Sequence, residues 1–241
     1  MNLVLIGLNH KTAPVELREK LACLAPEPAA AYQQLRQLPA LQEFLLYATC
    51  NRVEVLGATA EPEKAMVQVT HFFVSRPELS GVDITGALYQ YQEARAVEHL
   101  FEVACGLDSM VMGEPQILGQ VKASYKEATL QQSTGPILNR LLHKTFSVAK
   151  KVRTETGIGG LAVSVSYAAV ELARKIFGVL TGKTGLLIGA GEMAELAVEH
   201  LKRQGVARLI VANRTLARGL ELAQRFGGEA VSLAELETQL L

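Results

Sequence analysis

The residue best suited to covalent chemistry in this sequence is Cys50, which stands in the polar stretch Thr49-Cys50-Asn51-Arg52 directly after an apolar run. A cysteine that ends a strand and enters a polar turn is expected to be reachable from a cleft, and the charge of Arg52 favours the thiolate. Thiolate attack on an acyl ester gives a thioester, which is an activated acceptor for hydride. The alternative role is that of a small buried hydrophobic residue, which we expect of Cys23 and Cys105, each among Ala, Leu and Val.

Cofactor chemistry is indicated by the pattern G-x-G-x-x-A at residues 189–194, which follows an apolar strand-like run and opens a helical one. In that context the first glycine permits a tight turn, the second lets the backbone approach a pyrophosphate, and the alanine allows close packing of helix on strand. The pyrophosphate would then accept hydrogen bonds from N–H groups at the positive end of the helix. We therefore assign to cofactor binding the residues Gly189, Ala190, Gly191, Glu192, Met193 and Ala194.

The end of the next strand-like run refines the choice of cofactor. A site for NAD usually carries an acidic residue there, which binds the ribose 2′-hydroxyl, whereas this chain has Asn213, Arg214 and Thr215. Arg214 can pair with a 2′-phosphate, and Thr215 can add a hydroxyl or cap the following helix. The sequence therefore favours NADPH over NADH, and the alternative is that Arg214 is only a surface turn residue.

A third polar cluster lies in the glycine-broken segment 106–120, just before a helical stretch. It contains Ser109, Glu114, Gln116 and Gln120. Such groups can bind the ammonium, carboxylate or amide-like parts of an amino-acid ester. They are equally typical of helix caps and turns, so spacing alone leaves both interpretations open.

A basic strip is predicted on the amphipathic segment 136–155. Its apolar residues share one side of a helix, and Arg140, Lys144 and Lys151 fall together on the other side at a spacing of 3.6 residues. The two interpretations are a solvated helix face and a strip that binds phosphates along a nucleic-acid backbone.

These candidate sites must be held by a regular framework, and the first half of the chain alternates strand and helix patterns. The order β-α-β-β-α-β predicts a ferredoxin-like sheet with helices on one face. We expect strands at 3–8, 44–48, 53–58 and 87–92, and helices at 15–22, 28–38, 63–75 and 93–105.

The second half begins with a flexible break at 157–160, which we take as the boundary between domains 1–157 and 158–241. A connecting helix is expected at 164–177. Strands at 185–188, 208–212 and 229–231, with helices at 192–204 and 215–226, then make one βαβαβ half of a Rossmann-type, doubly wound fold. A complete dinucleotide domain normally needs a second half, so we expect the cofactor domain to be partial. The fold class is α/β.

Composition narrows the classes of protein to which the chain can belong. Of 241 residues, 49% are hydrophobic and 20% charged, which predicts a packed core. Lys and Arg number 24, as do Asp and Glu, so only a local patch can favour nucleic acid. Three cysteines without a CxxC pair indicate free thiols in a reducing cytoplasm. No signal peptide and no run of membrane-spanning length is recognisable, so we expect no membrane association.

The motifs together resemble the glutamyl-tRNA reductase family. The resemblance covers essentially the whole chain and rests on residues 7–14 (GLNHKTAP), 49–54 (TCNRVE), 106–122, 164–167 (SVSY), 189–194 and 213–215. The first three stretches are specific to that family, whereas the dinucleotide motifs are shared with shikimate-dehydrogenase-like proteins.

The resemblance implies reduction of glutamyl-tRNA with NADPH to glutamate-1-semialdehyde, the first step of the five-carbon route to tetrapyrroles and haem. It makes Cys50 the catalytic nucleophile and His99 a histidine important for activity. It also implies a cytoplasmic homodimer, with the dimerisation helices outside this chain, and a glutamate-1-semialdehyde aminomutase as recipient of the product. The substrate-binding positions that it implies are Thr49, Asn51, Arg52, Ser109, Glu114, Pro115, Gln116 and Gln120.

Two other functions remain open at this point. One is a different NADP-dependent oxidoreductase of the shikimate-dehydrogenase type, acting on a free hydroxy or keto acid. The other is a non-catalytic tRNA-binding or regulatory fragment, because the cofactor domain is cut short.

Overall fold

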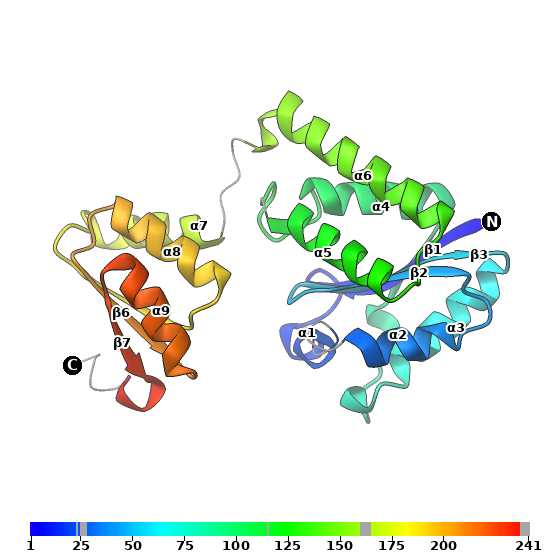
Figure 1. Cartoon of the computed structure of the whole chain (residues 1–241), viewed down its shortest axis with the longest axis horizontal. Helices are drawn as coiled ribbons and strands as arrows, with labels where there is room; N and C mark the ends of the chain where they lie inside the picture. The colour runs from blue at the N-terminus through cyan, green and yellow to red at the C-terminus, as the bar shows by residue number, and fades with distance from the viewer. Residues whose placement is uncertain (23, 25–27, 115, 160–164, 237–241) are drawn as a thin grey trace. The chain divides into compact units, whose positions relative to one another are not determined.

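The computed structural model describes the chain except residues 23, 25–27, 115, 160–164 and 237–241. It divides into two compact units, Met1–Ala162 and Val163–Leu241 (Figure 1). Each unit has its own sheet and its own apolar core. They are described separately.

The first unit is built on a four-stranded sheet in the order β2-β3-β1-β4. Every neighbouring pair is antiparallel. This order and these directions confirm the ferredoxin-like sheet that the sequence predicts. The strands are β1 (Asn2–Asn9), β2 (Glu43–Ala48), β3 (Arg52–Thr59) and β4 (Tyr89–Gln92).

Helices cover both faces of this sheet, so the prediction of helices on one face only is wrong (Figure 1). One layer comprises α1 (Val15–Ala22), α2 (Pro28–Arg36) and α3 (Pro62–Val74), and the other α4 (Glu93–Cys105), α5 (Gln116–Leu130) and α6 (Pro136–Glu155).

Neighbouring side chains of a strand point to opposite faces, and two residues of β2 show the consequence. Phe44 stacks on Tyr32 of α2, with ring centroids 5.8 Å apart. Glu43 accepts hydrogen bonds from the first N–H groups of α6, at 2.7 Å from Leu138 and 3.1 Å from Ile137. All eight residues of β3 are buried, as a sheet covered on both faces requires.

A tight loop follows α4 and carries part of the candidate site. Gly106 ends the helix with φ +79, a conformation that favours glycine, and Leu107 donates its N–H back to the Glu102 carbonyl at 2.8 Å. The N–H of Gly113 then donates to the Gly106 carbonyl at 2.8 Å. The bond between Gly106 and Gly113 therefore closes the loop, and Asp108 lies within it.

The second unit contains a three-stranded parallel sheet in the order β5-β6-β7. It comprises α7 (Val165–Phe177), β5 (Thr184–Ile188), α8 (Glu192–Arg203), β6 (Arg208–Asn213), α9 (Leu216–Phe226) and β7 (Glu229–Ser232). This is the predicted βαβαβ half of a doubly wound fold. Short 3-10 turns complete the chain at Pro77–Leu79, Thr85–Ala87, Gly157–Gly159 and Leu233–Glu235. None of the described helices combines the length and the apolar character needed to cross a membrane.

Candidate functional site

Cys50 lies in the tight turn that joins β2 to β3. The turn is closed by the Thr49 N–H, which donates to the Arg52 carbonyl at 2.8 Å. The Thr49 hydroxyl oxygen accepts hydrogen bonds from the N–H groups of Asn51 and Arg52, each at 3.2 Å. The side chain of Cys50 is exposed, as its polar turn predicts, whereas Cys105 is buried. Cys23 lies outside the described residues.

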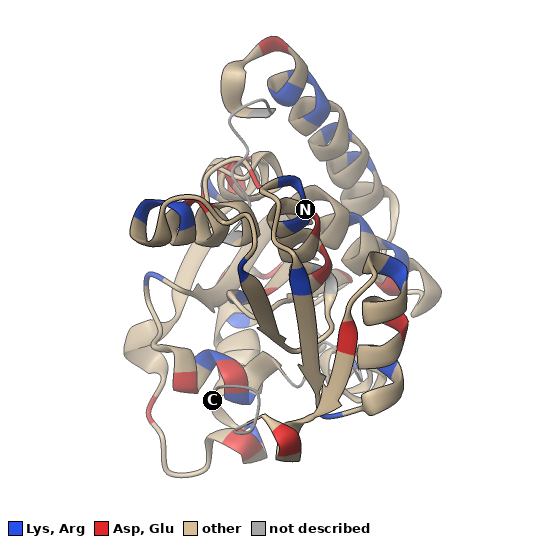
Figure 2. Cartoon of the chain, turned by 90° about the vertical axis from the view of Figure 1, so that its left-hand side faces the viewer, with Lys and Arg blue, Asp and Glu red and all other residues tan. Residues whose placement is uncertain are grey.

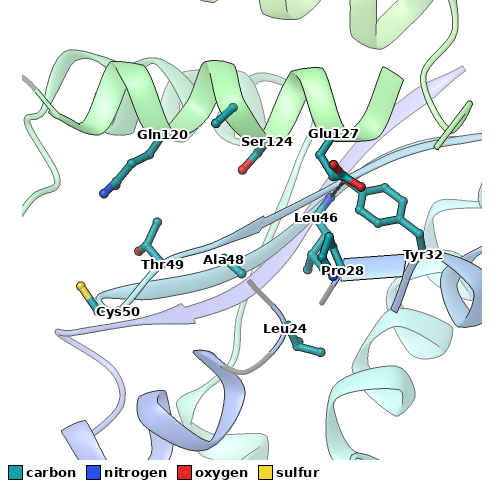
Figure 3. A pocket seen from close by; sticks show the side chains of 11 residues that line it. Leu24, Pro28, Tyr32, Leu46, Ala48, Thr49, Cys50, Gln120, Ser124 and Glu127 are labelled. Atoms are coloured by element: carbon teal, nitrogen blue, oxygen red, sulfur yellow. Dashed lines mark hydrogen bonds between the residues drawn. The ribbon is translucent and has the colours of Figure 1, made fainter. Parts of the chain in front are cut away.

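A hollow of about 450 Å³ opens beside this turn. Figure 3 shows Gln120 pointing from α5 towards Thr49 and Cys50, with Ser124 and Glu127 further along the same helix. The hollow therefore places a thiol at one end and amide, hydroxyl and carboxylate groups along one wall. The remaining lining is largely apolar and comes from Leu24, Pro28, Tyr32, Leu46, Ala48 and Ala123.

Arg18 of α1 bonds the turn that carries Cys50, and it was not among the site residues predicted from the sequence. Its Nη1 donates to the Cys50 carbonyl at 2.8 Å and to the Asn51 side-chain oxygen at 3.0 Å. Its Nε donates to the Ala13 carbonyl at 3.2 Å, and the side chain is buried. One guanidinium therefore fixes the nucleophile's backbone against the first helix.

Arg52 is 1% exposed and is enclosed by two carboxylates. It donates to Glu54 Oε1 at 2.7 Å and to Asp108 Oδ2 at 3.0 Å, and it also bonds the Asp108 carbonyl. Lys11 forms an ion pair with the other oxygen of Asp108, and Asn9 donates to Oδ2 at 3.1 Å. We call this set of charges, with His99, the buried charge network. Arg52 thus supports the site from within rather than lying in the hollow beside Cys50.

His99 ends the buried charge network. Its Nε2 lies 2.9 Å from Glu54 Oε1, and the ring is 2% exposed between Tyr89 and Tyr91. The Tyr89 hydroxyl donates to the same Glu54 oxygen at 2.5 Å. His99 does not line the hollow beside Cys50. In this arrangement the ring orients the Glu54 carboxylate. That carboxylate bonds Arg52, which ends the turn that carries Cys50.

The electrostatics of the two carboxylates follow from these contacts. Burial alone would raise the pKa of Glu54, but Arg52, His99 and Tyr89 hold it well below its ordinary value. Burial also opposes ionisation of Asp108, yet hydrogen bonds from Lys11 and Arg52 keep its pKa lowered. Both groups are therefore charged at neutral pH.

Three buried polar atoms near this network have no hydrogen-bond partner among the described residues: His10 Nδ1, the Tyr47 hydroxyl and Ser109 Oγ. The Tyr47 hydroxyl lies within electrostatic reach of Arg52 and Cys50, and burial raises its pKa. Burial and the charge of Arg52 lower the pKa of His10. An orphaned buried polar group costs about 1–3 kcal/mol, so three of them in one region call for a ligand or for water.

The predicted substrate positions thus fall into three groups. Thr49 and Gln120 line the hollow with Cys50. Asn51 follows Cys50 in the turn, and its side-chain oxygen accepts a hydrogen bond from Arg18. Ser109 belongs with the unpartnered polar atoms, and Arg52 is buried. The Glu114 carbonyl accepts a hydrogen bond from Arg153 of α6 at 3.3 Å, and Gln116 begins α5. Pro115 lies outside the described residues.

Several site residues were missed in the sequence, and the reason differs between them. Glu54 and Asp108 stand inside the quoted motifs but carry no local sign of their partners. Arg18 lies with Leu17 on the buried side of α1. An arginine on an apolar helix face is the one signal in the sequence that could have identified it. Tyr47 reads as an ordinary strand residue.

In the second unit, the glycine-rich loop connects β5 to α8. Gly189 has φ +106, and its N–H donates to the Ala212 carbonyl at 2.8 Å, so the turn needs glycine. Gly191 precedes the first turn of α8, and a Cβ built there would meet no atom within 4 Å. A hollow of about 290 Å³ adjoins Ala190 and Gly191.

The rest of the motif serves the fold around that loop. Ala190 and Ala194 pack on the core of the unit. The Met193 carbonyl accepts a hydrogen bond from Ser166 of α7 at 2.7 Å. The side chain of Glu192 lies outside the described part of the structure.

Asn213 is the last residue of β6, and Arg214 and Thr215 follow it at the surface. Arg214 is exposed and has no ion-pair partner among the described residues. The Asn213 side chain donates to the Thr215 carbonyl at 2.7 Å. Thr215 precedes α9 but makes no side-chain cap, so of its two suggested roles capping is not seen. The described residues contain no cluster of His, Cys, Asp and Glu that could hold a metal ion.

Fold and sites together define a class of α/β protein that carries an exposed cysteine on a ferredoxin-like unit and half of a dinucleotide-binding fold in a second unit. Residues 6–156 match the family model of the glutamyl-tRNAGlu reductase N-terminal domain, and residues 171–241 match that of shikimate/quinate 5-dehydrogenase. The chain belongs to the glutamyl-tRNA reductase family.

Relatives and a solved structure agree with this assignment. The chain is 52% identical over 240 residues to the glutamyl-tRNA reductase of Desulfatibacillum aliphaticivorans, covering 100% of this chain and 55% of that protein. It is 52% identical over 238 residues to that of Syntrophus aciditrophicus, covering 98% and 56%. The glutamyl-tRNA reductase structure from Methanopyrus kandleri matches with a TM-score of 0.62 at 37% identity, over 97% of this chain and 55% of that one. The chain spans about half the length of the curated relatives it matches.

Proposed function

We propose that the protein to which this chain belongs reduces glutamyl-tRNA to glutamate-1-semialdehyde with NADPH, as the first step of tetrapyrrole biosynthesis. The observation that carries the proposal is an exposed Cys50, on a hydrogen-bonded turn at the end of a hollow with one polar wall, in a member of this family. A shikimate-dehydrogenase-like activity of the whole chain is not favoured, because residues 6–156 match the reductase family.

The chemistry proceeds by acyl transfer and then reduction. The Cys50 sulfur forms a bond to the carbonyl carbon of the aminoacyl ester, the bond from that carbon to the terminal ribose oxygen breaks, and the oxygen takes up a proton. NADPH, when bound, would supply the hydride. With that hydride on the acyl carbon, the carbon–sulfur bond would break, and the aldehyde would leave while Cys50 returns as thiolate. Arg18 and Thr49 hold the nucleophile in place through these steps.

The amino-acid part of the substrate would be read by the polar atoms beside the turn. The His10, Tyr47 and Ser109 atoms without partners would gain them from the ammonium and carboxylate groups of a glutamyl residue. Gln120 of α5 lines the hollow beside Cys50 and would contribute an amide. The buried charge network fixes the segments that carry these atoms.

The second unit fits a phosphorylated dinucleotide by two observations. The space over Gly191 is open where a backbone would approach a pyrophosphate. Arg214 offers an exposed guanidinium where a 2′-phosphate requires a cation. Cytoplasmic location, dimerisation through segments outside this chain, and transfer of the aldehyde to glutamate-1-semialdehyde aminomutase are further parts of the proposal.

The test is capture of the acyl group. Full-length protein is incubated with tRNA carrying radiolabelled glutamate, without NADPH, and then denatured. Label should stay on the protein, should be released by hydroxylamine, and should be absent in Cys50→Ser while Cys105→Ser retains it. Label on Cys50→Ser, or reductase activity in that variant, would refute the thioester route.

A further inference from the structure

The surface of α6 carries an uneven distribution of charge. The helix contains five Lys and Arg residues and a single acidic residue, Glu155, at its end. Figure 2 shows these basic residues along α6, the helix at the upper right of that view. The whole chain has a formal net charge of zero. The excess on α6 is therefore local.

We give the name basic face to the four exposed cations of α6: Arg140, Lys144 and Lys151, which share one side of the helix, and Lys150 beside them. Within the described part of the chain, Arg140, Lys144 and Lys150 have no ion-pair partner, and Lys151 lies 3.9 Å from Glu155. The fifth cation, Arg153, points inward and donates to the carbonyls of Gly113 and Glu114 at 3.2 and 3.3 Å.

Several exposed arginines elsewhere on the chain lie beside acids, whereas others, such as Arg214, stand singly without an ion-pair partner among the described residues. Arg95 lies 2.9 Å from Glu98, Arg208 lies 2.8 Å from Glu229, and Arg225 lies 2.7 Å from Glu195. A merely solvated helix in this protein would be expected to show the same interspersed signs. The basic face departs from that pattern because four exposed cations gather on one helix with a single acid. Such a concentration favours a partner that brings negative charge.

The position of α6 connects the basic face to the Cys50 end of the unit. Arg140 and Lys151 are eleven residues apart, about 16 Å along a helix. The helix begins against Glu43 at the start of β2 and ends where Arg153 holds the loop after Asp108, which itself bonds Arg52. A chain of phosphates that follows the basic face is therefore led towards the end of the sheet at which Cys50 lies.

We propose that the basic face binds backbone phosphates of the tRNA whose aminoacyl end reaches Cys50. The inference rests on the proposed function, which supplies a polyanionic substrate. A chain of zero net charge has no overall attraction for RNA, so binding of such a substrate to this chain needs a local patch. Phosphate contacts position a nucleic acid without reading its sequence. The effect should therefore be the same for different tRNAs.

The experiment measures binding of fluorescently labelled, uncharged tRNA to the full-length protein between 50 and 200 mM salt, salt levels at which phosphate contacts are lost steeply. The variant R140Q/K144Q/K150Q/K151Q should bind at least about tenfold more weakly, and its slope of log affinity against log salt should fall by about 3, since each contact contributes about 0.7–0.9. The matched control removes four cations from elsewhere, as K64Q/R95Q/R174Q/R208Q, and should change affinity less than about twofold. The double variants R140Q/K144Q and K150Q/K151Q should each give about half of the loss in slope.

A second measurement separates docking from chemistry. Acylation of Cys50 by a small glutamate ester, which has no phosphate, should be unchanged in the α6 variant. Equal tRNA affinity and slope in the variant and wild type would overturn the inference and leave the proposed function standing. Loss of acylation by the small ester would also overturn it, because α6 would then act through the site. Full-length protein that binds no tRNA would overturn both.

Discussion

Arg18→Met separates the positioning of Cys50 from its reactivity, because Arg18 contacts the turn through the Cys50 carbonyl and the Asn51 side chain and not through the sulfur. The variant loses two hydrogen bonds to the turn and one to Ala13. A hydrogen bond to a charged group contributes about 1.5–3 kcal/mol when its partner is left buried. Water can reach the turn, since Cys50 is exposed. We therefore expect a loss of about 2–3 kcal/mol in the free energy of unfolding.

That loss is smaller than the stability of about 5–15 kcal/mol of a typical domain, so the variant should fold. A displacement of about 1 Å at a nucleophile costs on the order of 10²-fold in rate. Single-turnover acylation of Cys50 by glutamyl-tRNA should therefore fall about 100-fold. Alkylation of the same thiol by iodoacetamide, which needs no fixed orientation, should change little. Arg18→Lys, with a charge but no fork of donors, should recover part of the acylation rate.

The matched control is Arg36→Met on α2. Arg36 also donates to a backbone carbonyl, but its side chain is exposed and its partner is Gln131, which follows α5, rather than a residue of the Cys50 turn. It should cost less than about 1 kcal/mol and leave acylation unchanged. If Arg18→Met lowers stability while acylation keeps its wild-type rate, Arg18 supports only the fold and the positioning argument is wrong.

Three further predictions concern charge and space. Because the folded-state pKa of Glu54 is lowered, its charge stabilises the fold above the unfolded pKa near 4.5, and this contribution is lost as pH falls through the folded pKa. The free energy of unfolding, measured by denaturation from pH 7 to 2, should therefore fall less steeply for Glu54→Gln than for wild type. Parallel pH dependences would contradict this. Gly191→Val should keep the melting temperature, since its Cβ meets open space, but abolish saturable NADPH fluorescence; an unchanged Kd would argue against the loop as the pyrophosphate site. Arg214→Ser should weaken NADPH about 10- to 100-fold, the equivalent of one charge-assisted contact, and leave NADH unaffected; equal losses for both would remove the 2′-phosphate assignment.

Local patterns in the sequence were sufficient for most elements. The helix predicted from Pro136 to Glu155 has those bounds in the structure, because proline suits a first helical turn and Gly157 follows the end. The helix that ends at Cys105 is stopped by Gly106 in the left-handed conformation. Helix ends of this kind are determined by the adjacent residues, and so is the glycine-rich loop at 189–194.

Contacts between distant segments had no such signal. Arg52 is next but one to Cys50, and the sequence therefore suggested that its charge favours the thiolate. In the structure it faces Glu54, two residues along the same side of β3, and Asp108, which is 56 residues away. The first partner follows from strand alternation. The second depends on how α4 packs on the sheet, which no local pattern encodes. The second helical layer over the sheet was missed for the same reason.

The buried charge network explains why three separate motifs belong to one site. Lys11 follows β1, Arg52 begins β3, and Asp108 lies in the loop after α4, each in a different stretch among residues 7–14, 49–54 and 106–122. Lys11 and Arg52 bring two positive charges to the carboxylates of Glu54 and Asp108, so each charge has a partner of opposite sign. Removing Arg52 or Glu54 leaves an uncompensated buried charge, at a cost of about 3–5 kcal/mol, whereas Lys11 is 59% exposed and contributes less. The charges therefore fix the relative positions of the three segments, and through Arg52 they fix the first residue of the strand that leaves the Cys50 turn.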